Sequence, residues 1–336
     1  GMHMKQTENR VLLETRNLKK FFPVDKKADG RRSEVKAVND VSLVLRSDQV
    51  YGLVGETGCG KSTLGRTLLR LMEATSGQIL YKDQDITNIS QNEFRRYRQN
   101  MQMIFQDPYT SLNPRKSIGK ILEEVLAIQG VKKLRERMDR SLEILDRVGL
   151  RPEHYYRYPH EFSGGQRQRV GIARALILNP EFIVCDEPVS ALDVSIQSQI
   201  INLLLDLKEK AHLSYLFIAH DISVVRYISD RIGVMYLGYL FEEADTQELF
   251  DHPRHPYTQA LLASVPVIDF EKERGERKLI EGELPSPLSP PGGCVFHTRC
   301  PYVKEICRRQ CPAMINIGKG HRVMCHLYET QREEKN

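Results

Sequence analysis

Short apolar runs separated by polar turns make up the first part of the chain. A longer polar insertion, residues 23–34, interrupts this pattern. Apolar runs of this length, bounded by turn-forming residues, are typical of β-strands. The expected strands occupy residues 11–15, 35–38, 41–45 and 50–54.

A helical pattern follows the last of these runs. From Lys61 to about Met72, Leu64, Leu68 and Leu71 recur at i, i+4 and i+7, which predicts a helix with one apolar stripe against a sheet. Beyond it, strand-like and helix-like segments alternate, which predicts a mostly parallel sheet covered by helices on both faces. The later strands are expected at 77–81, 101–105, 182–185 and 215–219, and the later helices within 117–149 and at 194–210.

The composition changes beyond about residue 251. Pro, Gly, Cys and charged residues become frequent there, and residues 284–293 form a Pro-rich stretch that we expect to act as a stiff connector. A boundary is therefore predicted at this point. It divides the chain into a domain at 4–250 and a C-terminal extension at 251–336.

The charge and hydropathy of the whole chain exclude some classes of function. The 336 residues carry 49 basic and 44 acidic side chains, and the net charge of +5 is spread along the chain. A nucleic-acid interface would need a denser basic patch. No apolar run is long enough to span a bilayer, and the first residues, which resemble a cloning remnant up to His3, lack the apolar core of a secretory signal. We therefore expect a protein that is neither exported nor membrane-spanning.

Residues 55–62 read Gly-Glu-Thr-Gly-Cys-Gly-Lys-Ser and match the phosphate-loop pattern G-x-x-x-x-G-K-[ST]. The glycines allow a tight turn whose N–H groups point at phosphate, and the following helix directs its positive end to the same place. Lys61 is expected to hold the terminal phosphates of a nucleoside triphosphate, and Ser62 a Mg²⁺ ion. A glycine-rich turn that only joins strand to helix is the alternative, but it does not account for strand, loop, Lys-Ser pair and helix together. The candidate residues are Gly55, Glu56, Thr57, Gly58, Cys59, Gly60, Lys61, Ser62 and Thr63.

Residues 162–169, Phe-Ser-Gly-Gly-Gln-Arg-Gln-Arg, narrow the class of nucleotide-binding protein. Ser163 is expected to cap a helix while Gly164 and Gly165 leave the backbone open, so that hydroxyl, amides and helix dipole form an anion site. An ordinary cap before an amphipathic helix is the alternative, which explains the helix but not the paired glycines. Together with the phosphate loop, this segment resembles the signature of the ATP-binding-cassette (ABC) ATPases.

This resemblance implies a fold and an ATP site shared between two subunits. The implied fold class is an α/β P-loop NTPase with a mostly parallel sheet core, an antiparallel β subdomain, a helical signature subdomain at about 107–165 and a small Cys-containing C-terminal extension. ATP and Mg²⁺ are the implied cofactors. In the family, the signature segment contacts the γ-phosphate held by the phosphate loop of the partner subunit. That role falls to Ser163, Gly164, Gly165 and Gln166.

Two adjacent acids, Asp186 and Glu187, end an apolar strand at the edge where α/β sheets place ligands. The resemblance implies that Asp186 organises the Mg²⁺ that Ser62 contacts, and that Glu187 orients and deprotonates the attacking water. Without a phosphate loop, a solvated strand end would be the better interpretation. Gln106, just after its own strand, matches the family's residue that reaches the metal and the water and senses the transmembrane partner.

Three further positions match the family. Residues 190–193 resemble the segment that crosses to the opposite nucleotide site, and Asp193 is also predicted to cap the helix that follows. His220 matches the switch histidine that contacts the γ-phosphate and helps to hold the water; a packed or capping His is the alternative. Phe22 is expected to stack on adenine, with Phe21 as its rival and a place in the core as the alternative for either.

The seven cysteines are unevenly distributed, since five lie in roughly the last forty residues. Cys59 and Cys185 occupy positions where small residues fit, and we expect both to be packing thiols. The segment around 293–301 resembles the tail of the oligopeptide and dipeptide importer ATPases, some of which bind a four-iron cluster there. The expected ligands are Cys294, Cys300, Cys307 and Cys325.

Four thiolates fit either a [4Fe–4S] cluster or a tetrahedral Zn²⁺ ion, and the wide spacings, which lack C-x-x-C pairs, favour the cluster. Cys311 is an additional candidate, and His297 and His321 could compete as ligands. Reduced thiols in a small subdomain are the alternative to any metal.

Residues 254–261, Arg-His-Pro-Tyr-Thr-Gln-Ala-Leu, extend the resemblance to the F-type ATPases of peptide importers, and it runs from about Val11 to His326. It implies a peripheral subunit on the cytoplasmic side of the cell membrane that hydrolyses ATP to power oligopeptide or dipeptide uptake. The implied partners are two permease subunits, a homologous ATPase in a head-to-tail heterodimer and, indirectly, an extracytoplasmic substrate-binding protein, with no nucleic acid.

Three other functions remain open at this point. The family also includes importers of nickel and other small solutes. Soluble ABC ATPases that act on DNA or ribosomes usually carry a second cassette or long coiled coils, which are not found in this sequence. A regulatory binder that does not hydrolyse ATP conflicts with the intact Lys61, Glu187 and His220.

Overall fold

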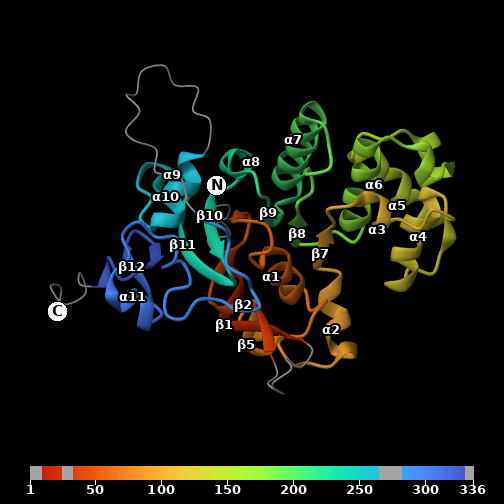
Figure 1. Ribbon diagram of the computed structural model, residues 1–336. Helices are drawn as coiled ribbons and strands as arrows, with labels where there is room; N and C mark the ends of the chain where they lie inside the picture. Colours follow the sequence, from red (N-terminus) through yellow and green to blue (C-terminus); the bar gives the residue numbers. More distant parts are fainter. Residues whose placement is uncertain (1–9, 25–32, 265–281, 330–336) are drawn as a thin grey trace, which may run out of the picture. The chain divides into compact units, whose positions relative to one another are not determined.

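The computed structural model describes residues 10–24, 33–264 and 282–329, so most of the predicted insertion at 23–34 lies outside the described residues. The chain forms two compact units (Figure 1). Unit 1 comprises residues 1–13, 45–50 and 81–219, and unit 2 comprises residues 14–44, 51–80 and 220–336.

Unit 1 is built on three parallel strands in the order β9-β8-β7. These are β7 (Met101–Ile104), β8 (Phe182–Asp186) and β9 (Ser214–Ile218). Every residue of β8 and β9 is buried, which explains why both read as continuous apolar runs. The short strand β6 (Gln84–Asp85) also lies in this unit. The strands predicted at 101–105, 182–185 and 215–219 are therefore confirmed to within a residue at each end.

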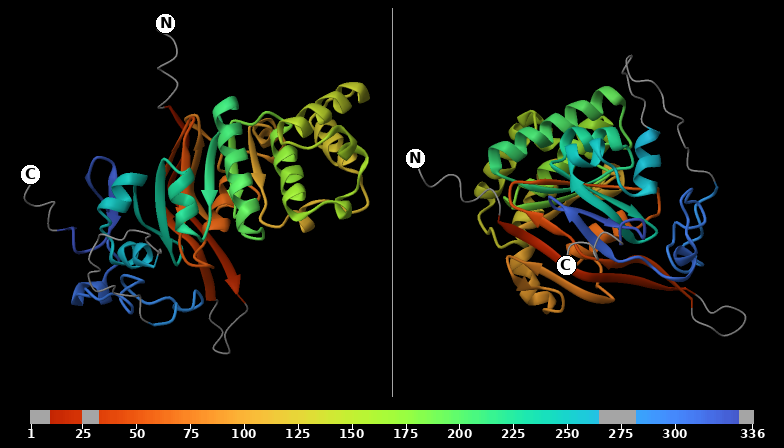
Figure 2. Two further views of the ribbon diagram at one scale, coloured as in Figure 1. Left: turned by 90° about the horizontal axis from the view of Figure 1, so that it is seen from above. Right: turned by 90° about the vertical axis from the view of Figure 1, so that its left-hand side faces the viewer.

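Helices surround and extend this small sheet. They are α2 (Gln91–Arg98), α3 (Pro108–Ser111), α4 (Ile118–Ile128), α5 (Leu134–Arg147), α6 (Gly164–Leu176) and α7 (Val194–Ala211), with the 3₁₀ turns η1 (Pro152–Tyr156) and η2 (Pro159–Glu161). Figures 1 and 2 show α4, α5 and α6 packed together as a bundle. The region predicted as helical at 117–149 thus forms two helices.

Unit 2 contains two sheets, and some of their strands begin or end in unit 1. The first runs β12-β13-β11-β10-β4, in which β10 and β4 are parallel and the other pairs are antiparallel. The second runs β2-β1-β5, with β3 also paired to β1. The strands are β1 (Val11–Val24), β2 (Ser33–Val41), β3 (Val44–Arg46), β4 (Val50–Val54), β5 (Ser76–Tyr81), β10 (Arg231–Tyr236), β11 (Tyr239–Asp245), β12 (Met314–Gly318) and β13 (His321–Met324).

The helices of unit 2 are short. They are α1 (Lys61–Leu68), α8 (Ile222–Ile228), α9 (Thr246–Asp251), α10 (Pro256–Ala263) and α11 (Glu305–Arg309). The helix predicted to run to about Met72 ends early, because Arg70 adopts a left-handed backbone with φ of 51°. Leu71 is consequently 52% exposed and does not belong to the apolar stripe, so that part of the prediction was wrong.

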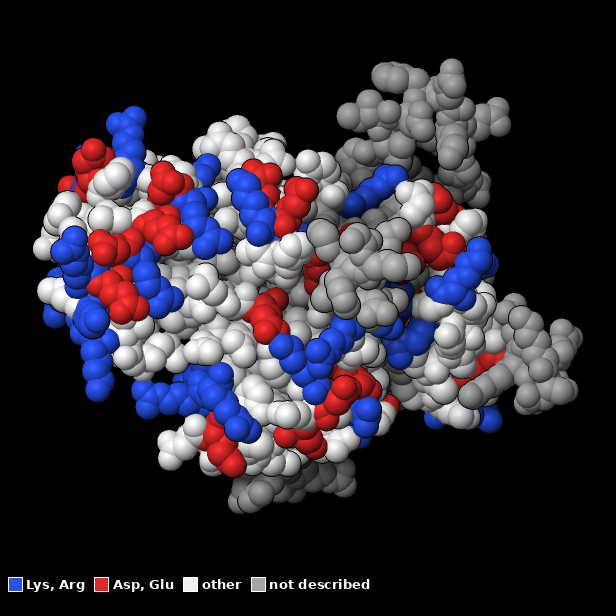
Figure 3. Space-filling view, turned by 180° about the vertical axis from the view of Figure 1, so that it is seen from behind, with Lys and Arg blue, Asp and Glu red and all other residues white. Residues whose placement is uncertain are grey.

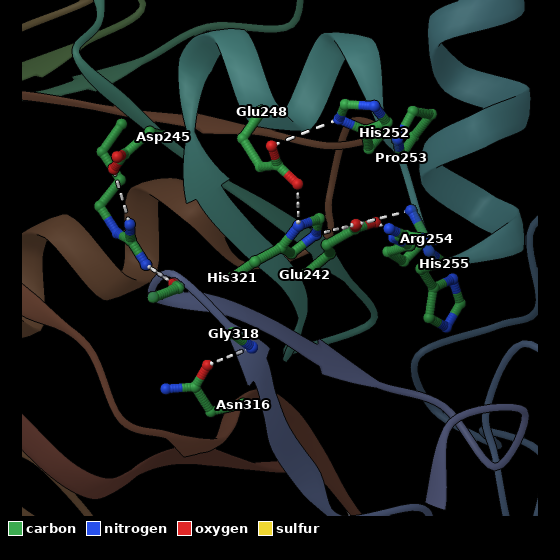
Figure 4. A network of polar contacts seen from close by, with 12 residues as sticks. Glu242, Asp245, Glu248, His252, Pro253, Arg254, His255, Asn316, Gly318 and His321 are labelled. Carbon is green, nitrogen blue, oxygen red and sulfur yellow. Dashed lines mark hydrogen bonds and ion pairs between the residues drawn. The ribbon is translucent and has the colours of Figure 1, made fainter. Parts of the chain in front are cut away.

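One buried carboxylate ties the C-terminal hairpin to this unit (Figure 4). Glu242, on β11, is fully buried and accepts hydrogen bonds from the backbone N–H groups of Arg254, at 2.7 Å, and His255, at 2.9 Å. The ring of His321, on β13, lies 2.6 Å from Glu242 through Nε2 and 3.4 Å from Glu248 through Nδ1. A buried carboxylate needs such hydrogen-bond and ion-pair partners, because they offset the free-energy cost of removing its charge from water.

An aromatic cluster packs α10 and the cysteine-containing segment against β10 and β11. Phe241 stacks on His255 with ring centroids 4.3 Å apart, and Tyr236 lies 4.8 Å from Tyr257 and 5.3 Å from Phe296. All five rings are buried. Offset and edge-to-face contacts of this kind add to the hydrophobic stabilisation of each ring.

The surface is mixed in charge. In the face shown in Figure 3, Lys and Arg side chains are interspersed with Asp and Glu, which accords with the small net charge. None of the helices in the described parts of the chain combines the length and the apolar character that crossing a membrane requires.

The buried His255 should make stability depend on pH. Burial lowers the pKa of His255 to about 3, against 6.5 for an exposed ring. Below pH 6.5 the unfolded chain therefore binds a proton that the folded chain does not bind. The free energy of unfolding consequently falls as the pH decreases, by about 1.4 kcal/mol per pH unit.

We expect His255→Asn to lose this part of the pH dependence, because Asn can still accept the Tyr257 N–H at the start of α10. Unfolding midpoints by calorimetry at about pH 7.5 and about pH 5.5 should fall less in the variant than in the wild type. Equal decreases in the two proteins would contradict the assignment.

Candidate functional site

The loop at 55–62 joins the buried strand β4 to helix α1, as predicted. Gly60 caps α1 with φ of 104°, and a Cβ atom there would lie 1.9 Å from the Ala37 carbonyl oxygen. At Gly55 a Cβ atom would lie 2.2 Å from the Met235 carbonyl oxygen. Only glycine fits at these two positions, because backbone on both sides leaves no room for a side chain.

The ammonium of Lys61 is held over this loop. Its Nζ donates to the carbonyl oxygens of Gly55, at 2.8 Å, and Glu56, at 3.2 Å, and the side chain is buried. The first backbone N–H groups of α1 lack partners within the helix, so together with Lys61 they make this end of the helix suited to an anion. Ser62 and Thr63 follow in the first turn and are half-buried.

Cys59 and Cys185, which the sequence predicts to be packing thiols, are both buried. Burial raises the pKa of Cys59 and of Cys185, so neither is a ready thiolate. The Cys59 carbonyl also accepts a hydrogen bond from the Gly238 N–H at 2.9 Å, which anchors the loop to the β10–β11 turn.

The acidic pair of unit 1 lies at the end of β8. Asp186 is 1% exposed, whereas Glu187 adopts a left-handed backbone with φ of 46° and donates its N–H to Ile218 on β9 at 2.9 Å. The amide Nε2 of Gln106 donates to the Glu187 carboxylate at 3.3 Å. The structure therefore brings Gln106 and Glu187 together. A non-glycine residue with positive φ stores strain, and such residues cluster at functional sites.

The signature segment begins α6 with a capping box. Ser163 Oγ accepts the Gln166 N–H at 3.3 Å, and the Gln166 side chain accepts the Ser163 N–H at 3.1 Å, which confirms the predicted cap. Buried Arg167 donates to the Pro159 and Phe162 carbonyl oxygens and so holds the preceding turn. The helix then packs through its apolar side, which the sequence predicts as Val170, Ala173, Leu176 and Ile177.

The second glycine of this segment has a packing reason that the sequence did not reveal. A Cβ atom on Gly165 would lie 2.6 Å from the Ile196 side chain of α7, while one on Gly164 would lie 3.4 Å from Leu192. Close packing between α6 and α7 therefore explains Gly165 without a ligand. The open backbone at Gly164 and the Ser163 cap remain as features of an anion site.

The predicted cap at Asp193 is wrong in part. Asp193 occupies the N-cap position of α7, but its exposed side chain makes no capping hydrogen bond. His220 is exposed and follows β9 by two residues. Phe21 and Phe22 lie on β1, both half-buried, with the ammonium groups of Lys36 and Lys20 respectively over their rings. Neither ring is buried in the core.

All four predicted cysteine ligands lie in unit 2, where the Cys294 N–H donates to the Cys307 carbonyl oxygen at 2.8 Å. The pKa of Cys294 rises to about 12, mainly through burial, with further increases from the charges of Cys307, Cys325 and Cys300. Burial also raises the pKa of Cys325 to about 11, and the charges of Cys300 and Cys307 add to it. Burial raises the pKa of Cys300 too, and the charge of Cys307 adds to the increase.

One of these sulfur atoms accepts a backbone hydrogen bond. The Lys304 N–H lies 3.5 Å from the sulfur of Cys307. Among the described residues, no group of three or more His, Cys, Asp or Glu side chains is close enough to hold a single metal ion.

The competing ligands have other surroundings. Cys311 is exposed, whereas Cys294 and Cys325 are buried. Both ring nitrogens of His321 face carboxylates, as Figure 4 shows, and Nδ1 of His297 lies 2.8 Å from the Cys294 carbonyl oxygen.

Two contacts to the phosphate loop were missed by the sequence analysis. The hydroxyl of Tyr257 accepts the Glu56 N–H at 3.0 Å, and Arg299 forms a two-pronged ion pair with the Glu56 carboxylate at 2.9 and 3.1 Å. These partners lie about 200 residues or more from Glu56 in the chain, and no local pattern marks them. The only available signal was the family resemblance of the segments that contain them.

Comparison with known proteins agrees with this arrangement. Residues 38–190 match the family described as ABC transporter, and residues 241–307 match the family described as oligopeptide/dipeptide transporter, C-terminal region. The chain is 55% identical to the oligopeptide transport ATP-binding protein AppF of Bacillus subtilis, covering 97% of this chain and 100% of that protein. It is 47% identical to the dipeptide transport ATP-binding protein DppF of Haemophilus influenzae, covering 95% and 97%.

Solved structures share the fold. A dimeric structure of the ATP-binding cassette MJ0796, in a post-hydrolysis state bound to ADP and phosphate, superposes with a TM-score of 0.62 at 27% identity, covering 70% of this chain and 99% of that one. The cbiO1 protein of Clostridium perfringens, part of the ABC transporter complex cbiONQ, gives a TM-score of 0.60 at 26% identity, covering 72% and 92%. The ABC-type P-loop NTPase fold inferred from the sequence is therefore confirmed, with mixed parallel and antiparallel sheets, whereas the Cys-containing C-terminal extension stays a prediction.

Proposed function

Because this chain belongs to the ATP-hydrolysing subunits of the oligopeptide and dipeptide ABC transporters, we propose that it powers uptake of peptides across the cell membrane from its cytoplasmic side. The observation that carries the proposal is the presence in one chain of a Lys61-bearing phosphate loop, a Ser163-capped signature helix and the C-terminal region typical of peptide transporters.

ATP would be bound by the loop residues Gly55 to Thr63, with Phe22 stacked on adenine and Phe21 as its rival. The half-buried state of both rings supports this role, since a fully packed ring could not accept a base. Ser62, Asp186 and Gln106 supply the oxygen ligands that Mg²⁺ prefers. Bound Mg²⁺ would offset the negative charge that develops on the phosphates during transfer.

Hydrolysis requires a group that takes a proton from water. Glu187 is the proposed base, and the hydrogen bond from Gln106 orients its carboxylate. Glu187 adopts a left-handed backbone directly after the strand that ends at Asp186. His220, exposed just after β9, is the proposed residue that contacts the γ-phosphate and holds the water in place.

Two cassettes are proposed to close around ATP, as the dimeric state of MJ0796 suggests. Ser163, Gly164 and Gln166 would contact the γ-phosphate bound by the partner, and exposed Asp193 would lie at the same interface. The proposed partners are a homologous ATPase, two permease subunits that receive the motion and, through them, an extracytoplasmic binding protein.

Glu187→Gln tests the assignment of the base. It should lower kcat for ATP hydrolysis roughly 10²- to 10⁴-fold, because the amide cannot accept the proton, while ATP binding persists. Steady-state hydrolysis and equilibrium ATP binding measure the two effects. Hydrolysis near the wild-type rate would remove Glu187 from this role, and a matched Glu181→Gln variant, altered at a surface ion pair with Lys82, should retain turnover.

The partners can be identified with the same variant. We expect tagged Glu187→Gln, incubated with ATP and native membranes in detergent, to retain two permease subunits and a sister ATPase, because closed cassettes cannot reopen without hydrolysis. Mass spectrometry of the bound fraction gives the answer. Recovery of ribosomal or DNA-associated proteins without permeases would overturn the transport function.

We also propose that Cys294, Cys300, Cys307 and Cys325 hold a [4Fe–4S] cluster. The Cys294 N–H donates to the Cys307 carbonyl oxygen at 2.8 Å, which brings two of the four cysteines together, and the Lys304 N–H lies 3.5 Å from the Cys307 sulfur. A hydrogen bond to a ligand sulfur is one of the interactions that tune cluster potentials. When bound, the cluster would stabilise this loop-rich segment, and no step of ATP hydrolysis is assigned to it.

Protein purified without oxygen should contain about four iron atoms per chain and a visible absorption that bleaches on reduction. Cys307→Ser should lose both signals, whereas Cys311→Ser, altered at an exposed thiol outside the proposed ligand set, should keep them. Colourless protein loaded with zinc would reject the cluster, and equal losses in the two variants would reject the ligand set.

A further inference from the structure

The second residue of the phosphate loop is an acid paired with an arginine from the far end of the chain. Glu56 is followed in the loop by Thr57 and Gly58, both exposed, and its own side chain is 30% exposed. The Arg299 guanidinium meets both carboxylate oxygens, at 2.9 and 3.1 Å, and its side chain is only 6% exposed. A two-pronged pair of this kind is directional as well as strong.

A carboxylate at this position opposes the binding of phosphate by the loop. Lys61, the backbone N–H groups and the end of α1 all attract phosphate. An unpaired carboxylate on the same short loop would repel it, because charges a few ångströms apart interact strongly near a protein surface. Arg299 removes this conflict by neutralising Glu56 without occupying the loop itself.

Arg299 is rigidly placed. Its N–H donates to the Phe296 carbonyl oxygen at 3.0 Å, and its guanidinium donates to the Tyr236 hydroxyl at 3.3 Å. Phe296 and Tyr236 belong to the buried aromatic cluster. Tyr257 of the same cluster accepts the Glu56 N–H, so the backbone and the side chain of Glu56 are held by one packed unit.

We propose that Arg299 is a positioning residue of the nucleotide site, which neutralises and orients Glu56 and thereby sets the affinity for ATP. The C-terminal segment that carries Arg299 is then part of the nucleotide site, and any loss of order in that segment weakens ATP binding. This inference rests on the proposed role of residues 55–62 as the phosphate site. It does not require a metal at the cysteines.

Arg299 could instead serve only as a structural tether that links the loop to the C-terminal segment. The two roles differ in whether each substitution raises or lowers the affinity for ATP. If Arg299 acts by neutralising Glu56, Arg299→Gln weakens ATP binding, while Glu56→Gln, which removes the repelling carboxylate and leaves the positive charge of Arg299, strengthens it. The double variant then returns close to the wild type. If the pair is only a structural tether, Glu56→Gln weakens binding as much as Arg299→Gln does, and combining them restores nothing.

The experiment is equilibrium binding of ATP with Mg²⁺ to the full chain, at low and high salt, with steady-state kinetics in parallel. We expect Arg299→Gln to raise Kd and KM for ATP about tenfold with kcat little changed, and the effect to shrink at high salt. Arg299→Lys should recover much of the affinity, because it keeps the positive charge and loses only the two-pronged geometry of the guanidinium.

Arg309→Gln is the matched control. Arg309 pairs with Glu305 in the same C-terminal segment at 2.7 Å, but both side chains are largely exposed, so its loss should leave ATP binding unchanged. Unfolding midpoints of all variants show which are folded. If Arg299→Gln does not fold, Glu56→Gln and Arg299→Lys still decide, because the tether requires both to weaken binding.

Wild-type affinity in folded Arg299→Gln, or weakened binding in Glu56→Gln, would overturn the proposal. Lys61→Ala tells this failure from a failure of the proposed function. Loss of ATP binding in Lys61→Ala supports the phosphate site whatever Arg299 does, whereas unchanged binding in Lys61→Ala would mean that residues 55–62 do not hold phosphate and would remove the basis for both proposals.

Discussion

The close packing of backbone around the phosphate loop is the constraint on which unit 2 depends. The Ala37 carbonyl of β2 and the Met235 carbonyl of β10 approach the loop glycines so closely that no side chain fits at Gly55 or Gly60. The loop therefore takes its shape from two strands that come from distant parts of the sequence. Lys61 then closes the loop from inside through its bonds to the loop carbonyls, so its ammonium has a fixed place in the loop.

Local patterns in the sequence predicted the features whose causes are local. The Ser163 cap depends on residues three positions apart, and the strands of unit 1 are apolar because both of their faces are covered. Leu71 was misplaced because the helix stops where Arg70 turns to positive φ, which an apolar period cannot show. Likewise, the reason for Gly165 lies on another helix, at Ile196.

The strands of the C-terminal region could not be predicted from alternation, since paired charges decide them. On β11, the neighbouring acids Glu242 and Glu243 are both buried. Burial alone would raise the pKa of Glu243, but the charges of Arg322 and Arg231 reverse this and lower it. The β13 hairpin strand supplies His321 to Glu242 and Arg322 to Glu243, at 2.6 Å in each case. A sequence rule that reads acids as solvent-exposed therefore fails on this strand.

These buried pairs join the C-terminal extension to the rest of unit 2, which also contains the loop at 55–62. Removing one partner of a buried pair leaves an uncompensated charge, which costs about 3–5 kcal/mol, so β11 cannot readily exist without the hairpin that contains His321 and Arg322. The same region contributes Tyr257 and Arg299 to the phosphate loop. The extension therefore supports the loop in two ways, by completing the sheet through charge pairs and by holding Glu56 directly. A segment that sequence composition separates at about residue 251 is, in its contacts, part of the compact unit that contains the loop at 55–62.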